Sequence, residues 1–248
     1  MWGGNVHKEE AGQSRRLHWR QGTSKPGAIV ATAEAAVETK MEPATGVKFA
    51  KQSVTPGSDE LELLGAGVRE KKVVLVNVKV YAVAFYVGDR GIHKLGPWRH
   101  TSADQLKKDE NFYKLLADGD FAKQLQIVLA RDVTGDQFYG ALEEALAPRV
   151  AAAGAGADGQ AAMGQFGNVF KGKSLKKGTG IFLSFEKPDI LHIGVVDDAS
   201  TLQPPENTEA SIASGPLIKA LFDVFLGPNA VSPSLRESIA DGAAEFLA

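Results

Sequence analysis

The sequence predicts one α+β domain built on an antiparallel sheet that helices cover. The chain has 248 residues, of which 44% are hydrophobic, so it can bury one sizeable core. A run of Val, Tyr and Phe residues over 73–87, free of Pro and Gly, is typical of a long β-strand. Strand and helix patterns follow one another in mixed groups without an internal repeat, which favours this architecture. We place the domain at residues 43–248.

Residues 1–42 differ from the rest of the chain. They are basic before Lys25, rich in Ala over 28–36, and show little apolar periodicity, so we expect disorder. Organelle transit peptides are basic and poor in acids, which makes this segment a candidate leader, although Glu9, Glu10 and Glu34 are atypical of one. The alternative is a non-native extension ahead of Met41.

The first strands surround a glycine pair. Residues 61–64 predict a short strand that ends at Gly65-Ala66-Gly67, and the long strand over 73–87 follows. Even positions of the long strand are nearly all apolar, whereas odd positions include Asn77, Lys79 and Tyr81. Because alternate side chains point to opposite faces, we expect the even face to be core. The odd face is then a wet face or the wall of a ligand cavity.

The middle of the chain predicts three helices and one strand. Ser102 and Gln105 form a capping box that opens a helix to about residue 117, and residues 123–133 alternate as a strand. Thr134 and Gln137 form a second capping box, and the helix behind it extends to about Pro148. A flexible loop over 154–159 leads to the third helix.

The C-terminal part predicts two strands and two helices. The strands over 181–185 and 190–196 enclose the turn residues 187–189. A helix begins at Pro216 and stops at Gly227-Pro228, and the last helix opens at Ser232-Pro233.

Composition excludes several classes of function. With 28 basic and 30 acidic residues the chain has no net attraction to nucleic acid, and no basic stripe indicates such a partner. It has no cysteine, and its five histidines lack ligand spacing, so we expect no metal and no cofactor. No apolar run approaches the roughly 18 residues that a membrane span requires. No Ser-His-Asp set can be nominated either.

Local sequence leaves two candidate binding residues open. A phosphate-loop interpretation of Gly65-Ala66-Gly67 fails because no third glycine and no helix follow; a bulge or bend explains the glycines better. Arg69 reads as an ordinary surface arginine, and Tyr81 as a strand aromatic packed on a helix. If both side chains turn inward, however, they can bind one carboxylate, because Arg offers a charged fork of donors and Tyr a hydroxyl.

Four segments resemble the chalcone isomerase-fold family. They are LLGAGVREKKVV (63–74), VKVYAVAFYV (78–87), LARDVTGDQFYGALEEAL (129–146) and ALFDVFLGPNAVSPSL (220–235). The similarity extends from about Pro43 to the C-terminus, and within the family it is closest to plant plastid fatty-acid-binding proteins of the third type. The resemblance implies an open-faced β-sandwich, in which a layer of helices covers a large antiparallel sheet and a ligand cleft lies between the long strands and the helices.

The resemblance also implies which residues line that cleft. The cleft arginine of chalcone isomerases is retained as Arg69, and the strand threonine corresponds to Tyr81. The helix tyrosine and asparagine correspond to Phe138 and Ala145, and the last hydroxyl corresponds to Val224. An alignment shifted by one residue would exchange Phe138 for its neighbour. Cyclising a chalcone requires hydrogen-bond donors that stabilise an enolate. Three of these positions, Phe138, Ala145 and Val224, have no side-chain donor.

We therefore expect a non-catalytic protein that binds a free fatty acid. Arg69 and Tyr81 would hold the carboxylate, and the apolar cleft, which also includes Phe225, would hold the alkyl chain at roughly 0.8 kcal/mol per buried methylene. As the family comparison implies, we expect a monomer in the chloroplast stroma that supports fatty-acid metabolism, with the cytoplasm as the alternative location. The competing functions are a chalcone isomerase and a non-catalytic enhancer of flavonoid synthesis.

Overall fold

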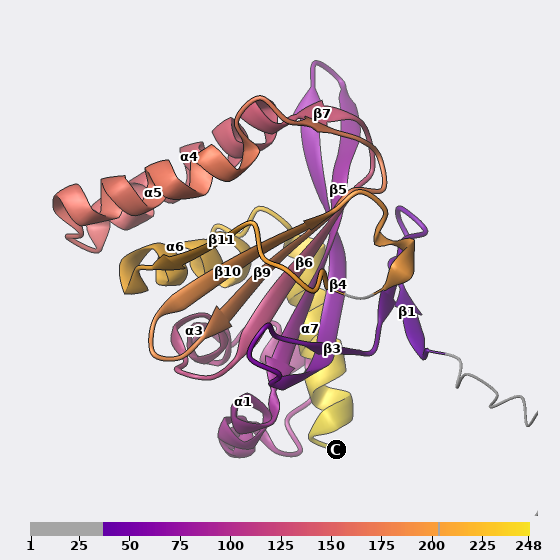
Figure 1. The fold of residues 1–248 in the computed structure, drawn as a ribbon. Helices are drawn as coiled ribbons and strands as arrows, with labels where there is room; N and C mark the ends of the chain where they lie inside the picture. The colour runs from indigo at the N-terminus through magenta and orange to yellow at the C-terminus, as the bar shows by residue number, and fades with distance from the viewer. Residues whose placement is uncertain (1–36, 203) are drawn as a thin grey trace, which may run out of the picture. The chain divides into compact units, whose positions relative to one another are not determined.

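A seven-stranded antiparallel sheet is the frame of the fold in the computed structural model, which describes residues 37–202 and 204–248 (Figure 1). Its strand order is β11-β10-β9-β6-β5-β4-β3, and two small sheets, β1-β2 and β7-β8, stand beside it. The strands are β1 (Thr39–Met41), β2 (Lys48–Ala50), β3 (Gln52–Val54), β4 (Glu60–Val73), β5 (Val76–Gly88), β6 (Lys123–Leu129), β7 (Val133–Thr134), β8 (Ser174–Leu175), β9 (Gly180–Glu186), β10 (Ile190–Val196) and β11 (Ala210–Ala213).

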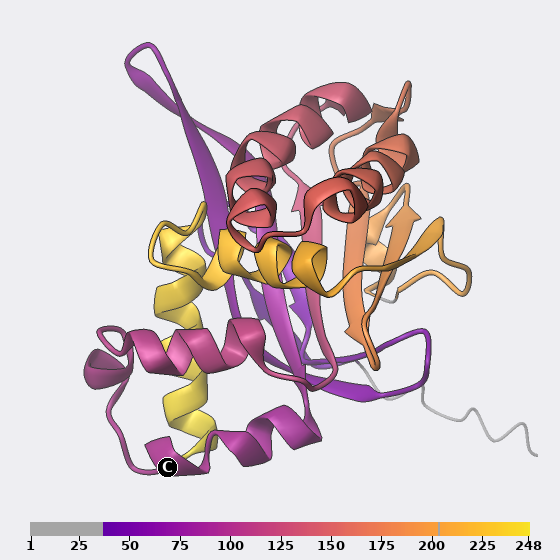
Figure 2. The same ribbon diagram turned by 90° about the vertical axis from the view of Figure 1, so that its left-hand side faces the viewer.

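A layer of helices covers one face of this sheet, as Figure 2 shows for α3 to α7. The helices are α1 (Asp89–Lys94), η1 (Gly96–Trp98), α2 (Ala103–Leu106), α3 (Glu110–Asp118), α4 (Gly135–Ala152), α5 (Gly156–Phe170), η2 (Ala199–Thr201), α6 (Gly215–Leu226) and α7 (Pro233–Phe246). The main apolar core lies between the helices and the sheet. The predicted α+β class and the open-faced sandwich are confirmed.

The predicted long strand over 73–87 is wrong at its start. β4 does not end at the glycines but continues to Val73, and a two-residue turn at Val74 and Leu75 leads directly into β5. Propensity could not show this break, because the turn consists of the same aliphatic residues as the strands. The predicted bulge is present, since the register shifts between Leu63 and Gly65.

A second register shift in the same hairpin changes which side chains share a face. Tyr81 pairs with Arg69 but Lys79 pairs with Glu70, so Val80 has no partner across the ladder. The extra residue inverts the alternation beyond it. The expectations of a plain core on the even face and of a wet odd face are therefore wrong, whereas the alternative of a cavity wall holds at Tyr81, which lines a pocket. Positions 81–87 are buried on both faces, whereas Val74 and Val76, assigned to the core, are exposed.

The glycines of β4 allow helix α7 to contact the strand's backbone. A Cβ atom on Gly67 would lie 2.3 Å from the Leu235 nitrogen, and one on Gly65 would lie 2.5 Å from the Ile239 nitrogen. Serines of α7 then form hydrogen bonds with the backbone of the strand; for example, the Val68 amide donates to Ser234 Oγ at 3.0 Å. Because these contacts fix β4 just before Arg69, the glycine pair positions the arginine rather than binding a phosphate.

Several element boundaries also differ from those predicted. The helix expected over 102–117 is two helices, α2 and α3, because the Asp109 side chain caps a new start by accepting from the Asn111 and Phe112 amides. The strand expected over 123–133 ends at Leu129. The loop expected over 154–159 already contains the first turn of α5.

The N-terminal boundary moves by a few residues. Residues 39–41, assigned to the disordered extension, form β1 and pair with β2. The remainder of the candidate leader, residues 1–36, lies outside the described residues. None of the described helices is both long and apolar enough to cross a bilayer.

Candidate functional site

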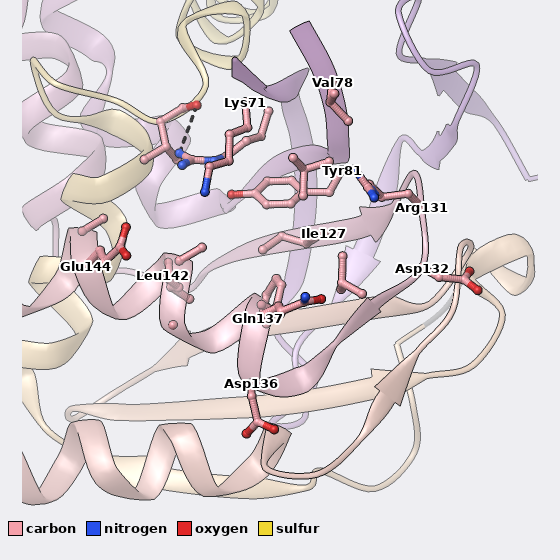
Figure 3. Close-up of a pocket in the computed structure, with 18 residues that line it drawn as sticks. Lys71, Val78, Tyr81, Ile127, Arg131, Asp132, Asp136, Gln137, Leu142 and Glu144 are labelled. Atoms are coloured by element: carbon pink, nitrogen blue, oxygen red, sulfur yellow. Dashed lines mark hydrogen bonds between the residues drawn. The ribbon is translucent and has the colours of Figure 1, made fainter. Parts of the chain in front are cut away.

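A pocket of about 450 Å³ opens between the β4-β5 hairpin, the end of β6 and helix α4 (Figure 3). Its residues come from segments far apart in the sequence, including Arg69, Tyr81, Ile127, Phe138 and Val231. Ligand pockets typically enclose about 300–1,000 Å³, so the volume suits a small molecule.

Arg69 lies on β4 directly opposite Tyr81 on β5, so both side chains share one face of the sheet. Arg69 is a half-buried residue, and its guanidinium donates one long hydrogen bond of 3.4 Å, from Nη1 to the Val231 carbonyl, which the dashed line in Figure 3 marks. None of the ion pairs formed among the described residues includes Arg69. Most of its five N–H donors are therefore free to bind an anion in the pocket.

Tyr81 presents its hydroxyl to the same space. The side chain is only 6% exposed, and the hydroxyl points into the pocket in Figure 3. Its ring lies 6.4 Å from that of Phe138 and 6.5 Å from that of Phe225, measured between ring centroids, which holds the phenol in place. Burial raises the pKa of Tyr81 far above its ordinary value, although the Arg69 charge opposes this shift. The hydroxyl thus remains protonated, makes none of the hydrogen bonds found in the described chain, and can donate to a ligand.

Helix α4 lines the pocket with apolar side chains and, at exposed positions, with Asp136, Gln137 and Glu144. Phe138 and Leu142 are 6% exposed each, lie one helical turn apart, and face the pocket together with the half-buried Ala145. Tyr139 points elsewhere, because its hydroxyl donates to the Met163 carbonyl at 2.7 Å. Of these two adjacent residues, Phe138 faces the pocket and Tyr139 does not.

Two of the expected cleft residues lie elsewhere. Val224 and Phe225 on α6 are completely buried in the main core, and neither is among the residues that line the pocket. The Val224 side chain on α6 is therefore part of the core and does not line the pocket. Phe225 contacts the Tyr81 ring and acts on the pocket only through that residue.

Charged residues at the rim were not predicted. Lys71, Arg131 and Glu144 line the pocket and are exposed. Asp132 also lies there, but its carboxylate accepts from the Lys177 amide at 2.8 Å and pairs with Lys176. No local pattern distinguishes these residues from solvated surface charges; the pairing of Lys71 with Val78 across the ladder is what brings that lysine to the rim.

The pocket combines hydrogen-bond donors with apolar side chains. Within the described residues no group of three or more His, Cys, Asp and Glu side chains could hold a metal ion. The Gln137 side-chain oxygen belongs to the capping box, where it accepts from the Thr134 amide at 3.1 Å. Arg69 and Tyr81 are convergent donors beside the apolar side chains of Phe138 and Leu142, and this combination fits an anion with an apolar tail.

Comparisons with known proteins agree with this fold. The family model described as chalcone-flavanone isomerase matches residues 44–246. A chalcone-flavanone isomerase of Oryza sativa subsp. japonica is 30% identical over 208 residues, which is 82% of this chain and 88% of the relative. One from Gentiana triflora is 31% identical over 199 residues, covering 79% and 88%. A crystal structure of an Arabidopsis thaliana fatty-acid-binding protein superposes with a TM-score of 0.68 at 23% identity, covering 85% of this chain and 99% of that one.

Proposed function

The chain belongs to the chalcone-flavanone isomerase family, and we propose that it is a non-catalytic member that binds free fatty acids in the pocket at Arg69 and Tyr81. The observation that carries the proposal is the pair itself. Arg69, a half-buried residue that pairs with no carboxylate among the described residues, lies directly across the ladder from the buried Tyr81, whose hydroxyl has no hydrogen-bond partner in that same part of the chain. A partly buried guanidinium gains from a charged partner, so these donors favour an anion as the ligand.

The other end of the ligand is expected to be an alkyl chain. The wall formed by Phe138, Leu142 and Ala145 offers no hydrogen bond, and each methylene removed from water contributes roughly 0.8 kcal/mol. The Arabidopsis thaliana protein that shares the fold is named a fatty-acid-binding protein, and this supports the same ligand class here.

Isomerase activity is the second candidate, because the curated relatives at about 30% identity are named chalcone-flavanone isomerase. Arg69 is the residue that favours it. Adding a phenolate to an enone leaves an enolate that needs placed donors, and the two α4 positions that correspond to the family's tyrosine and asparagine are Phe138 and Ala145, which have no side-chain donor. We therefore expect no turnover of naringenin chalcone above spontaneous cyclisation, measured by its absorbance.

Calorimetric titration tests the binding proposal. We expect the protein to bind a saturated fatty acid, to bind the matched fatty alcohol much more weakly, and to lose most fatty-acid affinity in Arg69→Ala. The control is Arg99→Ala, because Arg99 is an exposed arginine outside the pocket. Equal affinity for acid and alcohol, or unchanged affinity in Arg69→Ala, would remove the proposal. Catalysed chalcone turnover would replace it with the isomerase.

A further inference from the structure

The tip of the β4-β5 hairpin exposes a continuous apolar surface. Val74, Leu75 and Val76 are 86%, 87% and 64% exposed, and in the described part of the chain they are the most exposed large apolar side chains. Val73 and Val76 form the last pair of the ladder, so Val74 and Leu75 are the two turn residues. Soluble proteins rarely place consecutive bulky aliphatic residues at such a tip.

The turn itself does not explain these residues. Val74 has a φ angle of +55°, in the left-handed region, where hairpin turns favour Gly, Asn or Asp. A β-branched residue is strained in this region, and its side chain packs on nothing. Gly at the first turn position would suit this backbone better, so the apolar residues contribute something other than folding.

A basic collar lies immediately behind the tip. Lys71 and Lys72 are exposed, and neither side chain takes part in the hydrogen bonds or ion pairs of the described residues. Lys79 faces Glu70 across the ladder, so the hairpin ends carry three lysines against one glutamate. The whole chain has a net charge of -2, which makes this positive end a local feature.

The hairpin extends past the rest of the sheet. β6 pairs with β5 only as far as Tyr81, and beyond that point β4 and β5 continue as a two-stranded ribbon that projects from the sheet in Figures 1 and 2. Strand residues rise about 3.3 Å each, so Lys72 and Lys71 lie roughly 7–10 Å behind Val74. Apolar residues that bind at a bilayer surface enter it by about 5–10 Å, which would bring these ammonium groups to the level of the lipid phosphates.

We propose that this hairpin tip docks the protein on lipid surfaces that carry anionic head groups. Val74, Leu75 and Val76 enter the head-group region, and Lys71 and Lys72 contact the phosphates. A stable protein interface buries about 800 Å² on each partner, far more than one two-residue turn provides, whereas a bilayer surface needs no complementary shape.

Docking would also orient the pocket. Lys71 and Val78, which belong to the same ribbon, line the pocket, so its mouth lies close to the surface that the tip enters. A fatty acid leaving the bilayer could then reach Arg69 by passing Lys71. This last step rests on the proposed fatty-acid binding, whereas docking itself does not.

Vesicle flotation tests the docking. We expect the protein to float with vesicles of phosphatidylcholine containing about 30% phosphatidylglycerol and to bind pure phosphatidylcholine vesicles far less. In the double variant Val74→Gly/Leu75→Asn we expect at least ten-fold weaker binding, while its turn suits the hairpin better and its fold is retained. Lys71→Gln/Lys72→Gln should weaken binding on the order of 30-fold, because each lysine near the surface contributes about one factor of five.

The controls separate docking from its alternatives. The control variant Lys94→Gln/Lys108→Gln removes two exposed lysines outside the hairpin, one at the end of α1 and one just after α2. It should bind vesicles as the wild type does. Equal binding to both vesicle types, or unchanged binding in the tip variant, overturns the proposal. So does a wild-type dimer that the tip variant abolishes in analytical ultracentrifugation, because a second copy would then be the occupant. If the wild type floats but binds no fatty acid in solution, docking stands and the proposed function fails.

Discussion

Two basic side chains lie on the helix-covered face of the same sheet, and their surroundings differ. Lys123 on β6 is opposite Val87 and is 1% exposed, whereas Arg69 is opposite Tyr81 and half-buried. The Lys123 amine donates to the carbonyls of Leu116, Ala117 and Gly119, at 3.1 Å to the first and 3.0 Å to the last. Arg69 has one long hydrogen bond to a carbonyl.

The difference shows how a structural cation can be told from a binding one. Burial lowers the pKa of Lys123 to about 7, and the charges of Asp118 and Asp120 oppose this shift. Three carbonyls at the end of α3 and the rings of Phe121, Phe185 and Phe222 surround the amine, so the protein itself supplies every partner. At Arg69 the protein supplies a cavity instead, which leaves the partner to a ligand.

The largest effect is expected at Lys123. Lys123→Met would leave three carbonyls without their donor, and we expect a loss of about 3 kcal/mol in the free energy of unfolding, measured with urea. Fatty-acid affinity of the folded variant should be unchanged. Lys114→Met, at a 73% exposed position on α3, is the control and should have little effect. Wild-type stability in Lys123→Met would show that the two cations do not differ in this way.

Arg69 should show the opposite pattern. In Arg69→Met we expect unfolding within about 0.5 kcal/mol of the wild type, because no ion pair in the described structure is lost. Fatty-acid affinity should fall about 10- to 100-fold, since hydrogen bonds to charged groups contribute about 1.5–3 kcal/mol. Urea denaturation and calorimetric titration measure the two quantities on one sample. A strongly destabilised variant would mean that Arg69 is structural after all.

Tyr81→Phe should give a smaller loss. It removes the hydroxyl but keeps the ring that contacts Phe138 and Phe225, so stability should not change. We expect fatty-acid affinity to fall about 2- to 10-fold, as for a neutral hydrogen bond of about 0.5–1.5 kcal/mol. A loss as large as that in the Arg69 variant would indicate that the phenol, and not the guanidinium, dominates head-group binding.

The smallest effect is expected at Glu144. Its carboxylate lines the same pocket and repels an anionic ligand, so Glu144→Gln should raise fatty-acid affinity about two-fold at low salt and less at high salt. Glu143→Gln is the matched control, because that neighbour faces Tyr139 outside the pocket. Weaker binding in Glu144→Gln would show instead that the carboxylate helps to hold the ligand.

Much of the fold could be predicted because its signals are local. The capping box of Thr134 and Gln137 begins α4 as expected, and the turn at 187–189 joins β9 to β10. The turn at Val74 and Leu75 could not be predicted, since β-branched residues there look like strand. The division at Asp109 was missed because its cap lies within an otherwise continuous helical pattern.

By itself the sequence determined the antiparallel α+β architecture, the apolar face of α4 and the candidate pair Arg69 and Tyr81. Only the tertiary structure decided that these two residues face each other, because one unpaired residue at Val80 sets the register of the hairpin. It also turned Val224 and Phe225 into the core and away from the pocket. The physical reason is that periodicity fixes which side chains share a face of one element, whereas a binding site depends on which elements meet.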